Sequence, residues 1–188
     1  MSLHEKDERK IIERILCGHA DEFSYFVERY GDCIFSLVAK IVAIQEDAEE
    51  IVQDTFLVAY THLADYNSSA SFSTWLYRIA YNKAVSHLRK VRPKVYLDDT
   101  AVDLVDDSDA DRALRIETDE RLKLLEQAVD KLPPDDKMLV VLYHLEERTA
   151  GDVAYIMGMT EQNVRTRLHR VRKKLYLLMK ENMNDEKR

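Results

Sequence analysis

Glycine and proline are scarce in this sequence, and that scarcity constrains the fold more than any other feature. The 188 residues include four glycines and three prolines, whereas the two types together make up about 12% of an average protein. Both residue types mark the turns between short elements. All-β folds and glycine-rich nucleotide-binding folds are therefore disfavoured, and long helices are expected.

Charge is segregated along the chain. The net charge of −7 at pH 7 argues against a protein that coats nucleic acid unaided. Residues 77–94 and 163–175 nevertheless carry six Lys or Arg each and no acid, whereas residues 96–111 carry seven Asp and no base. A further acidic cluster covers residues 46–54. The pattern favours at least two partners of opposite charge, although solvated helix faces would give it too.

Hydrophobic periodicity predicts two groups of helices separated by the acidic segment. The expected helices cover residues 7–17, 21–44, 46–64, 72–91, 112–131, 134–146, 150–157 and 161–182. The acidic segment has too few apolar residues and too many like charges to form a core. We expect an all-α fold in which two small helical domains, residues 1–94 and 112–188, are joined by a flexible acidic linker, residues 95–111.

Several classes of function are disfavoured by the absence of their motifs. No apolar run approaches the ~18 residues of a membrane span, and the N-terminus has no apolar signal segment, so we expect a cytoplasmic protein without membrane insertion. Cys17 and Cys33 are the only cysteines and form no metal-binding motif. The six histidines are scattered, and motifs of metalloproteases, serine hydrolases and P-loop proteins are missing. We expect no enzymatic activity, no metal and no cofactor.

Residues 149–175 have the pattern of a helix-turn-helix. Gly158 provides a left-handed residue that ends a short helix, and Thr160 caps the next helix. An apolar stripe forms the back of that second helix: Val164, Leu168, Val171, Leu175 and Leu178. Its front carries Gln162, Thr166, His169 and Lys173, and its flanks carry Arg165, Arg172, Arg167, Arg170 and Lys174. Such a helix fits the DNA major groove, with its flanks on phosphates and its front on base edges. A basic helix that is solvated or faces an acidic partner is the alternative.

Two helices of the first domain carry further candidate surfaces. On helix 46–64, Leu57 lies in a polar face with Glu46, Glu50, Gln53, Asp54 and Thr61, as an interface anchor within a polar rim would. Isolated exposed leucines are also common. On helix 72–91, one side gathers Trp75, Arg78, Asn82, Ser86 and Arg89. Aromatic residues beside a basic helix suit single-stranded bases; we assign Tyr77 and Tyr81 to the core.

Three segments in register resemble the extracytoplasmic-function (ECF) sigma factors of bacteria, which belong to the sigma-70 family. They are DAEEIVQDTFLVAY, SFSTWLYRIAYNKAVSHLRK and LPPDDKMLVVLYHLEERTAGDVAYIMGMTEQNVRTRLHRVRKKL. The resemblance covers about residues 10–180. It implies sigma region 2 and sigma region 4 on a flexible linker, and a protein that binds core RNA polymerase and directs it to promoters.

The resemblance also implies roles for individual residues. It assigns the binding of the beta-prime clamp helices of polymerase to Glu50, Gln53, Asp54 and Leu57. Recognition of the minus-ten element falls to Tyr66, Asn67, Phe72, Arg78, Asn82, Lys83, Ser86 and Arg89, with a flipped base held by the loop before residue 72. Recognition of the minus-thirty-five element falls to Thr160, Gln162, Asn163, Arg165, Thr166, Arg167, His169, Arg170 and Lys173. The implied partners are core polymerase (beta-prime clamp helices and beta flap), promoter DNA and an anti-sigma factor.

Two other readings remain open from the residues alone. An autonomous dimeric helix-turn-helix regulator would use the C-terminal motif but has no use for residues 46–90. A protein-interaction module would direct its basic helix to an acidic partner and would not depend on DNA.

Overall fold

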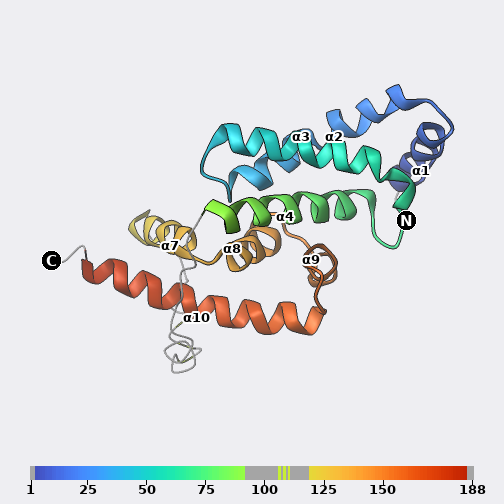
Figure 1. Ribbon diagram of the computed structural model, residues 1–188. Helices are drawn as coiled ribbons and strands as arrows, with labels where there is room; N and C mark the ends of the chain where they lie inside the picture. The colour runs from blue at the N-terminus through green and yellow to red at the C-terminus, as the bar shows by residue number, and fades with distance from the viewer. Residues whose placement is uncertain (1–2, 92–105, 107, 109, 111–118, 186–188) are drawn as a thin grey trace.

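The computed structural model describes the backbone of residues 3–91, 106, 108, 110 and 119–185. Within these residues every regular element is a helix (Figure 1). This agrees with the all-α fold expected from the scarcity of glycine and proline. The predicted linker lies almost entirely outside the described residues, and the boundaries 1–94, 95–111 and 112–188 stay predictions.

The N-terminal half forms the predicted helices with changed ends. Its elements are α1 (Leu3–Leu16), η1 (Ala20–Phe23), α2 (Ser24–Ala39), α3 (Gln45–Thr61), η2 (Leu63–Asp65) and α4 (Phe72–Val91). Gly18 follows α1 with a φ of 110°, which favours glycine. The expected helix 21–44 is divided into the short turn η1 and α2, and α2 ends earlier than expected. Ser71 caps α4, because its Oγ accepts from the backbone N–H of Thr74 at 3.2 Å.

The C-terminal half contains the predicted helix-turn-helix. Its elements are α7 (Asp119–Lys131), α8 (Pro134–Val140), the π-helical turn η3 (Val141–Leu145), α9 (Ala150–Met157) and α10 (Glu161–Asp185). Gly158 ends α9 with a φ of 68°. The Oγ1 of Thr160 accepts from the N–H of Asn163 at 3.2 Å, as expected for the cap of α10. The predicted helix 134–146 is regular only to Val140 and then widens into η3.

Aromatic rings fill the core of the N-terminal half. Phe26 and Phe72 are fully buried with ring centroids 4.1 Å apart, and Ile34 and Leu37 are buried beside them in the same core. Tyr77 is also buried, as predicted. Trp75 is half-buried and lies against Phe72 at 5.6 Å between ring centroids.

The two halves touch along α4. Figure 1 shows α4 between α2 and α3 on one side and α8 and α9 on the other, with α10 beyond them. The core of buried apolar residues is continuous across both halves. The sequence predicted two domains on a flexible connector and gave no indication of this direct contact.

Replacing Ile34 with alanine tests the core of the first half. Because Ile34 is fully buried, the I34A variant should lose about 2–5 kcal/mol of unfolding free energy through lost burial and the cavity left behind. Urea unfolding followed by circular dichroism measures this loss. The control is L57A, which shortens an exposed side chain and should change stability by less than about 0.5 kcal/mol. Equal losses in both variants would contradict the assignment of Ile34 to the core.

Candidate polymerase and nucleic-acid interfaces

The outer face of α3 presents an apolar side chain within acidic and polar surroundings. Leu57 is 61% exposed, and Glu50 and Gln53 are exposed on the same helix. The Oδ2 of Asp54 accepts from the Nζ of Lys83 at 2.8 Å, so α3 and α4 are joined at the edge of this face. The opposite side of α3 is buried through Ile51, Thr55 and Ala59. The helix therefore displays Leu57 on a fixed support.

Helix α10 has the apolar back and polar front expected of a DNA-reading helix. Val164, Val171, Leu175 and Leu178 are buried, and Leu168 is half-buried. The side chains exposed on α10 include Gln162, Asn163, Arg165, Thr166, His169 and Arg170. Lys173 is half-buried, and Thr160 is exposed at the cap. The first turns of α10 are thus exposed, as insertion of this helix into the major groove of DNA requires.

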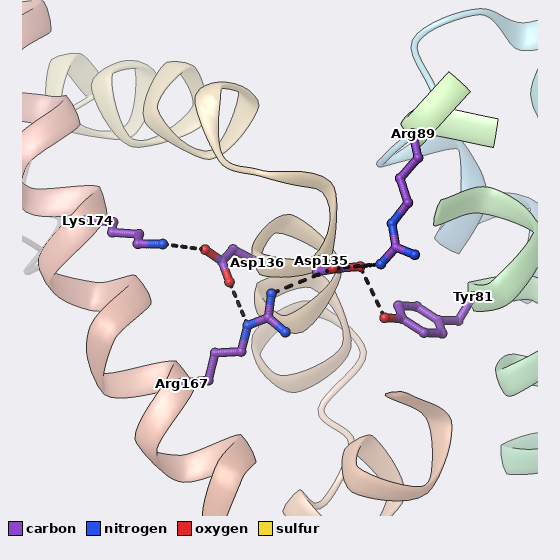
Figure 2. A network of polar contacts seen from close by, with 6 residues as sticks. All are labelled: Tyr81, Arg89, Asp135, Asp136, Arg167 and Lys174. Atoms are coloured by element: carbon purple, nitrogen blue, oxygen red, sulfur yellow. Dashed lines mark hydrogen bonds and ion pairs between the residues drawn. The ribbon is translucent and has the colours of Figure 1, made fainter. Parts of the chain in front are cut away.

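Two basic side chains of α10, Arg167 and Lys174, are directed toward α8. Figure 2 shows the side chain of Arg167 directed toward Asp136 on α8, with Nε 2.7 Å from Oδ1. Lys174 donates to the other oxygen of Asp136 at 3.0 Å. Asp136 is buried, and two cations offset the cost of burying its carboxylate. Arg167 and Lys174 therefore hold α10 against α8.

The predicted minus-ten loop is closed by its own hydrogen bonds. The hydroxyl of Tyr66 donates to the carbonyl of Ala70 at 2.9 Å, and the N–H of Ser69 donates to Oδ1 of the exposed Asn67 at 3.0 Å. Phe72 is 1% exposed and forms part of the core, so it has little surface to offer a ligand.

The polar face of α4 is divided between open and occupied residues. Asn82 and Ser86 are exposed, whereas Lys83 is engaged with Asp54. Arg89 donates to both oxygens of Asp135 on α8, at 2.9 and 3.1 Å (Figure 2). The guanidinium of Arg78 lies 5.1 Å from the ring centroid of Tyr155 on α9, a cation–π distance. Two basic residues predicted to bind promoter DNA thus face the C-terminal half instead.

Three acidic residues of the C-terminal half face α4. Asp135 also accepts from the hydroxyl of Tyr81 at 3.2 Å, and Glu146 accepts from the hydroxyl of Tyr77 at 3.1 Å. Asp152 accepts from the hydroxyl of Thr74 at 3.0 Å. Sequence reasoning missed all three, because acids in the first turn of a helix, such as Asp135 and Asp152, ordinarily stabilise that turn.

This contact surface shifts the ionisation of two tyrosines. Burial raises the pKa of Tyr77 to about 12, with a further contribution from Glu146. Burial and the nearby Asp135 raise the pKa of Tyr81 to about 12. Both hydroxyls therefore stay protonated, as donors, throughout the physiological range.

An apolar groove lies in the C-terminal half, and its lining includes Lys40 of the N-terminal half. It has a volume of about 700 Å³ between α7, η3 and α10 and is lined mainly by Leu122, Leu125, Val129, Leu145 and Leu168. Burial and the nearby Arg172 lower the pKa of His144 in its wall, which favours the neutral imidazole. The exposed Leu122 and Leu145 suit it to an apolar partner surface.

Two other kinds of feature are absent from the parts of the chain that the structure describes. No group of three His, Cys, Asp or Glu side chains there could hold a metal ion. No helix among the described residues is long and apolar enough to cross a membrane.

Comparison with known proteins identifies both halves. Residues 26–93 match Sigma-70 region 2, and residues 122–175 match Sigma-70, region 4. The chain is 30% identical over 175 residues to the ECF RNA polymerase sigma factor SigW of Bacillus subtilis, covering 89% of this chain and 94% of SigW. The chain belongs to the ECF sigma factors of the sigma-70 family. The resemblance recognised in its sequence is therefore confirmed.

Solved structures share the fold of this sigma factor. The structure of CnrH in complex with the cytosolic domain of CnrY superposes with a TM-score of 0.65 at 23% identity, covering 92% of this chain and 96% of CnrH. RpoE of Bartonella quintana, in complex with the anti-sigma factor NepR, gives a TM-score of 0.59 at 19% identity, covering 85% and 97%. At these identities the likeness shows the fold alone. The described helices thus have the arrangement of a two-region sigma factor.

Alkaline titration tests the burial of three tyrosines: Tyr77 and Tyr81 at the contact between regions 2 and 4, and Tyr30, whose pKa burial also raises to about 12. The pKa values of Tyr77 and Tyr81 are raised from 10.0 to about 12, so their stabilising contribution is complete below pH 10 and is lost as the pH rises toward 12. We expect the melting temperature to fall over this window, and ultraviolet absorbance to show late-ionising tyrosines. Y77F should remove one late-ionising group. Ionisation of all ten tyrosines near pH 10 in the folded protein would contradict the burial of these hydroxyls.

Proposed function

We propose that this sigma factor binds core RNA polymerase and directs it to promoters through two separate DNA-reading surfaces. The division of roles follows the predicted boundaries: residues 1–94 dock on polymerase and read the minus-ten element, residues 95–111 connect, and residues 112–188 read the minus-thirty-five element. The observation that carries the proposal is the presence of sigma regions 2 and 4 on one chain in family order. Run-off transcription with core polymerase is the direct test.

Docking on the beta-prime clamp helices falls to the outer face of α3. The exposed Leu57 provides the apolar anchor, and Glu50, Gln53 and Asp54 provide the polar rim. The apolar groove between α7, η3 and α10 offers a second polymerase contact, with the beta flap. Contacts at both ends of the chain would fix the separation of regions 2 and 4 on polymerase.

Reading of the minus-ten element falls to the loop before α4 and to the polar face of α4. Tyr66 and Asn67 would contact a flipped base, and Phe72, which is buried in the core, would support the ring of Tyr66 at 5.6 Å between ring centroids. Asn82 and Ser86 are open to a neighbouring base, and Arg78, Lys83 and Arg89 would bind phosphates once they leave their present partners. Unpaired bases suit this arrangement, because a flipped base exposes its Watson–Crick edge to side chains.

Reading of the minus-thirty-five element falls to α10. Gln162, Asn163 and Thr166 lie on its open first turns, where a helix-turn-helix meets base edges. His169 and Lys173 continue this front toward base edges. Phosphate contacts are assigned to the cap residue and the flanking basic residues: Thr160, Arg165, Arg167 and Arg170. Arg167 would contribute in the closed protein mainly by holding α10 on α8, because its Nε is engaged by Asp136.

The free protein is closed in a way that opposes DNA binding. Arg78 and Arg89 are engaged by region 4, and Asp135, Glu146 and Asp152 place negative charge on the face of α4 that DNA would occupy. Polymerase would separate the two regions and expose that face. Promoter binding by the isolated chain should therefore be weak, and specific binding should require core polymerase. The further idea that the Asp-rich linker inhibits the free protein concerns residues outside the described ones.

Other readings explain less of the molecule. An autonomous dimeric helix-turn-helix regulator accounts for α10 but not for a region 2 match over residues 26–93. An interaction module that ignores DNA accounts for neither the open front of α10 nor its cap. We also infer a non-enzymatic protein of the cytoplasm, in keeping with a transcription initiation factor. An anti-sigma factor is a further proposed partner, as for the structural neighbour bound to NepR.

Combining Asp54→Lys with Leu57→Ala tests polymerase docking. The double variant loses the apolar anchor and reverses a rim charge, so its affinity for core polymerase should fall at least about tenfold, as for a hot-spot residue. Fluorescence anisotropy of the labelled sigma factor measures the affinity. L16A is the matched control, since Leu16 is also an exposed leucine of region 2 but lies on α1. Unchanged affinity in the double variant would overturn the docking assignment.

Neutralising the acids that face α4 tests the closed state. The variant Asp135→Asn, Glu146→Gln, Asp152→Asn removes the charge of the three carboxylates that accept from α4, including the ion pairs of Asp135 with Arg89 and of Glu146 with Lys40, each worth about 0–1 kcal/mol. The affinity of the free protein for promoter duplex should rise about tenfold, measured by mobility shift at low salt. D65N is one control, because Asp65 contacts His62 within region 2. A variant that binds DNA as weakly as the unmodified chain would show that these contacts do not restrain it.

A further inference from the structure

An ion pair joins the helix proposed to dock on polymerase to the helix proposed to read the minus-ten element. The Nζ of Lys83 on α4 lies 2.8 Å from the Oδ2 of Asp54 on α3. Helices α3 and α4 lie side by side (Figure 1), and a second pair, His87 with Asp47 at 3.3 Å, joins the same two helices. The proposed function assigns Asp54 to polymerase and Lys83 to DNA, so each of these side chains now occupies the other.

The two helices carry opposite charges. Helix α3 contains five acidic residues and no Lys or Arg. Helix α4 contains four basic residues, Arg78, Lys83, Arg89 and Lys90, and no Asp or Glu. Electrostatic complementarity therefore requires positive charge from a partner of α3 and negative charge from a partner of α4. The two partners do not compete for the same group.

Both members of the Lys83–Asp54 pair are accessible to a ligand. The side chain of Lys83 is 36% exposed and that of Asp54 is 48% exposed. By contrast, the side chain of Asp136 is 4% exposed, and its cations hold α10 against α8. An exposed pair contributes little to stability, so the fold does not depend on the contact between Lys83 and Asp54, and ligands can replace it.

While the pair is closed, each charge weakens the binding of the other side chain's ligand. The carboxylate of Asp54 repels a phosphate that approaches Lys83, and the ammonium group of Lys83 repels a cation that approaches Asp54. A cation of polymerase that neutralises Asp54 therefore makes Lys83 available to a phosphate. Thermodynamic linkage requires the reverse effect to be equally large.

We infer that the Lys83–Asp54 pair couples polymerase docking to the binding of the minus-ten strand. Each ligand binds more tightly when the other is present, because the pair has to be broken only once. The inference rests on the proposed function, which supplies both ligands. It gives Lys83 a second role, since in the absence of DNA this lysine restrains the docking of α3 on polymerase.

Removing the charge of Lys83 tests this restraint without DNA. K83Q should bind core polymerase about threefold more tightly than the unmodified chain, a small effect because exposed ion pairs are weak. Fluorescence anisotropy of the labelled chain at low ionic strength, where screening is least, measures the affinity. K90Q is the matched control: it removes the same charge from an exposed lysine of α4 and should leave the affinity unchanged.

A double-mutant cycle assigns the gain to the pair. In a chain that already carries D54N, adding K83Q should give no gain in polymerase affinity, because the partner of Lys83 is already neutral. The cycle compares K83Q with and without D54N, so it remains informative although D54N alone weakens docking.

The reverse effect is measured on DNA without polymerase. D54N should bind a single-stranded oligonucleotide of random sequence about threefold more tightly than the unmodified chain, because phosphate contacts carry no sequence information. D32N removes the same charge from an exposed aspartate of α2 and should give a smaller gain.

The outcomes separate this inference from the function on which it rests. If the unmodified chain does not bind core polymerase, the proposed function fails and the inference fails with it. If it binds, but K83Q binds no more tightly, or the gain persists beside D54N, or D54N gains no more DNA affinity than D32N, only the coupling through this pair is overturned.

Discussion

The packing of α4 on both of its sides is the constraint on which the rest of the structure depends. Its apolar side, with Leu76, Ala80 and Ala84 fully buried, completes the core of region 2. Its other side meets α8 and α9 of region 4 through hydroxyl, cation–π and carboxylate contacts. The first set of contacts lies within region 2 and persists when region 4 leaves. The second set joins part-buried hydroxyl contacts to an apolar core that is continuous across both halves. A partner that separates the regions must therefore cover the apolar surface that it exposes as well as replace the polar contacts.

The polar side of α4 pairs with carboxylates of region 4 for the same chemical reason that it would pair with DNA phosphates. The Nη2 of Arg89 donates to both oxygens of Asp135. Because a guanidinium that pairs with a carboxylate also suits a phosphate, Arg89 can exchange Asp135 for DNA. Region 4 thus presents to α4 the negative charge that a nucleic acid would present. The net charge of −7 and this contact both oppose the binding of nucleic acid. Both would weaken the binding of promoter DNA by the free chain, as we propose for this sigma factor.

The features that could be predicted from the sequence are those that depend only on helical periodicity and on neighbouring residues. The stripe of Val164, Val171 and Leu175, the cap at Thr160 and the exposure of Leu57 all follow from helical period and neighbouring residues, and the structure confirms them. Helix ends were less accurate, since the π-helical turn after Val140 has no sequence signal that we recognised. Contacts between distant segments were missed, including Arg89 with Asp135, Arg167 with Asp136, and Glu8 beside the loop. The local sequence around each of those acids is that of an ordinary helix, so their partners become evident only from the tertiary fold.

Asp135 lies between α4 and α10. Besides Arg89 and Tyr81 of α4, its Oδ2 lies 3.9 Å from the Nη2 of Arg167 on α10. Two guanidinium groups thus share one carboxylate. When a ligand takes Arg89 away, the carboxylate is left to Arg167, which it then holds more firmly. Thermodynamic linkage makes such an effect reciprocal. Departure of region 2 would therefore tighten the packing of α10 against α8, so that the charge which closes the molecule would afterwards stabilise the position of α10.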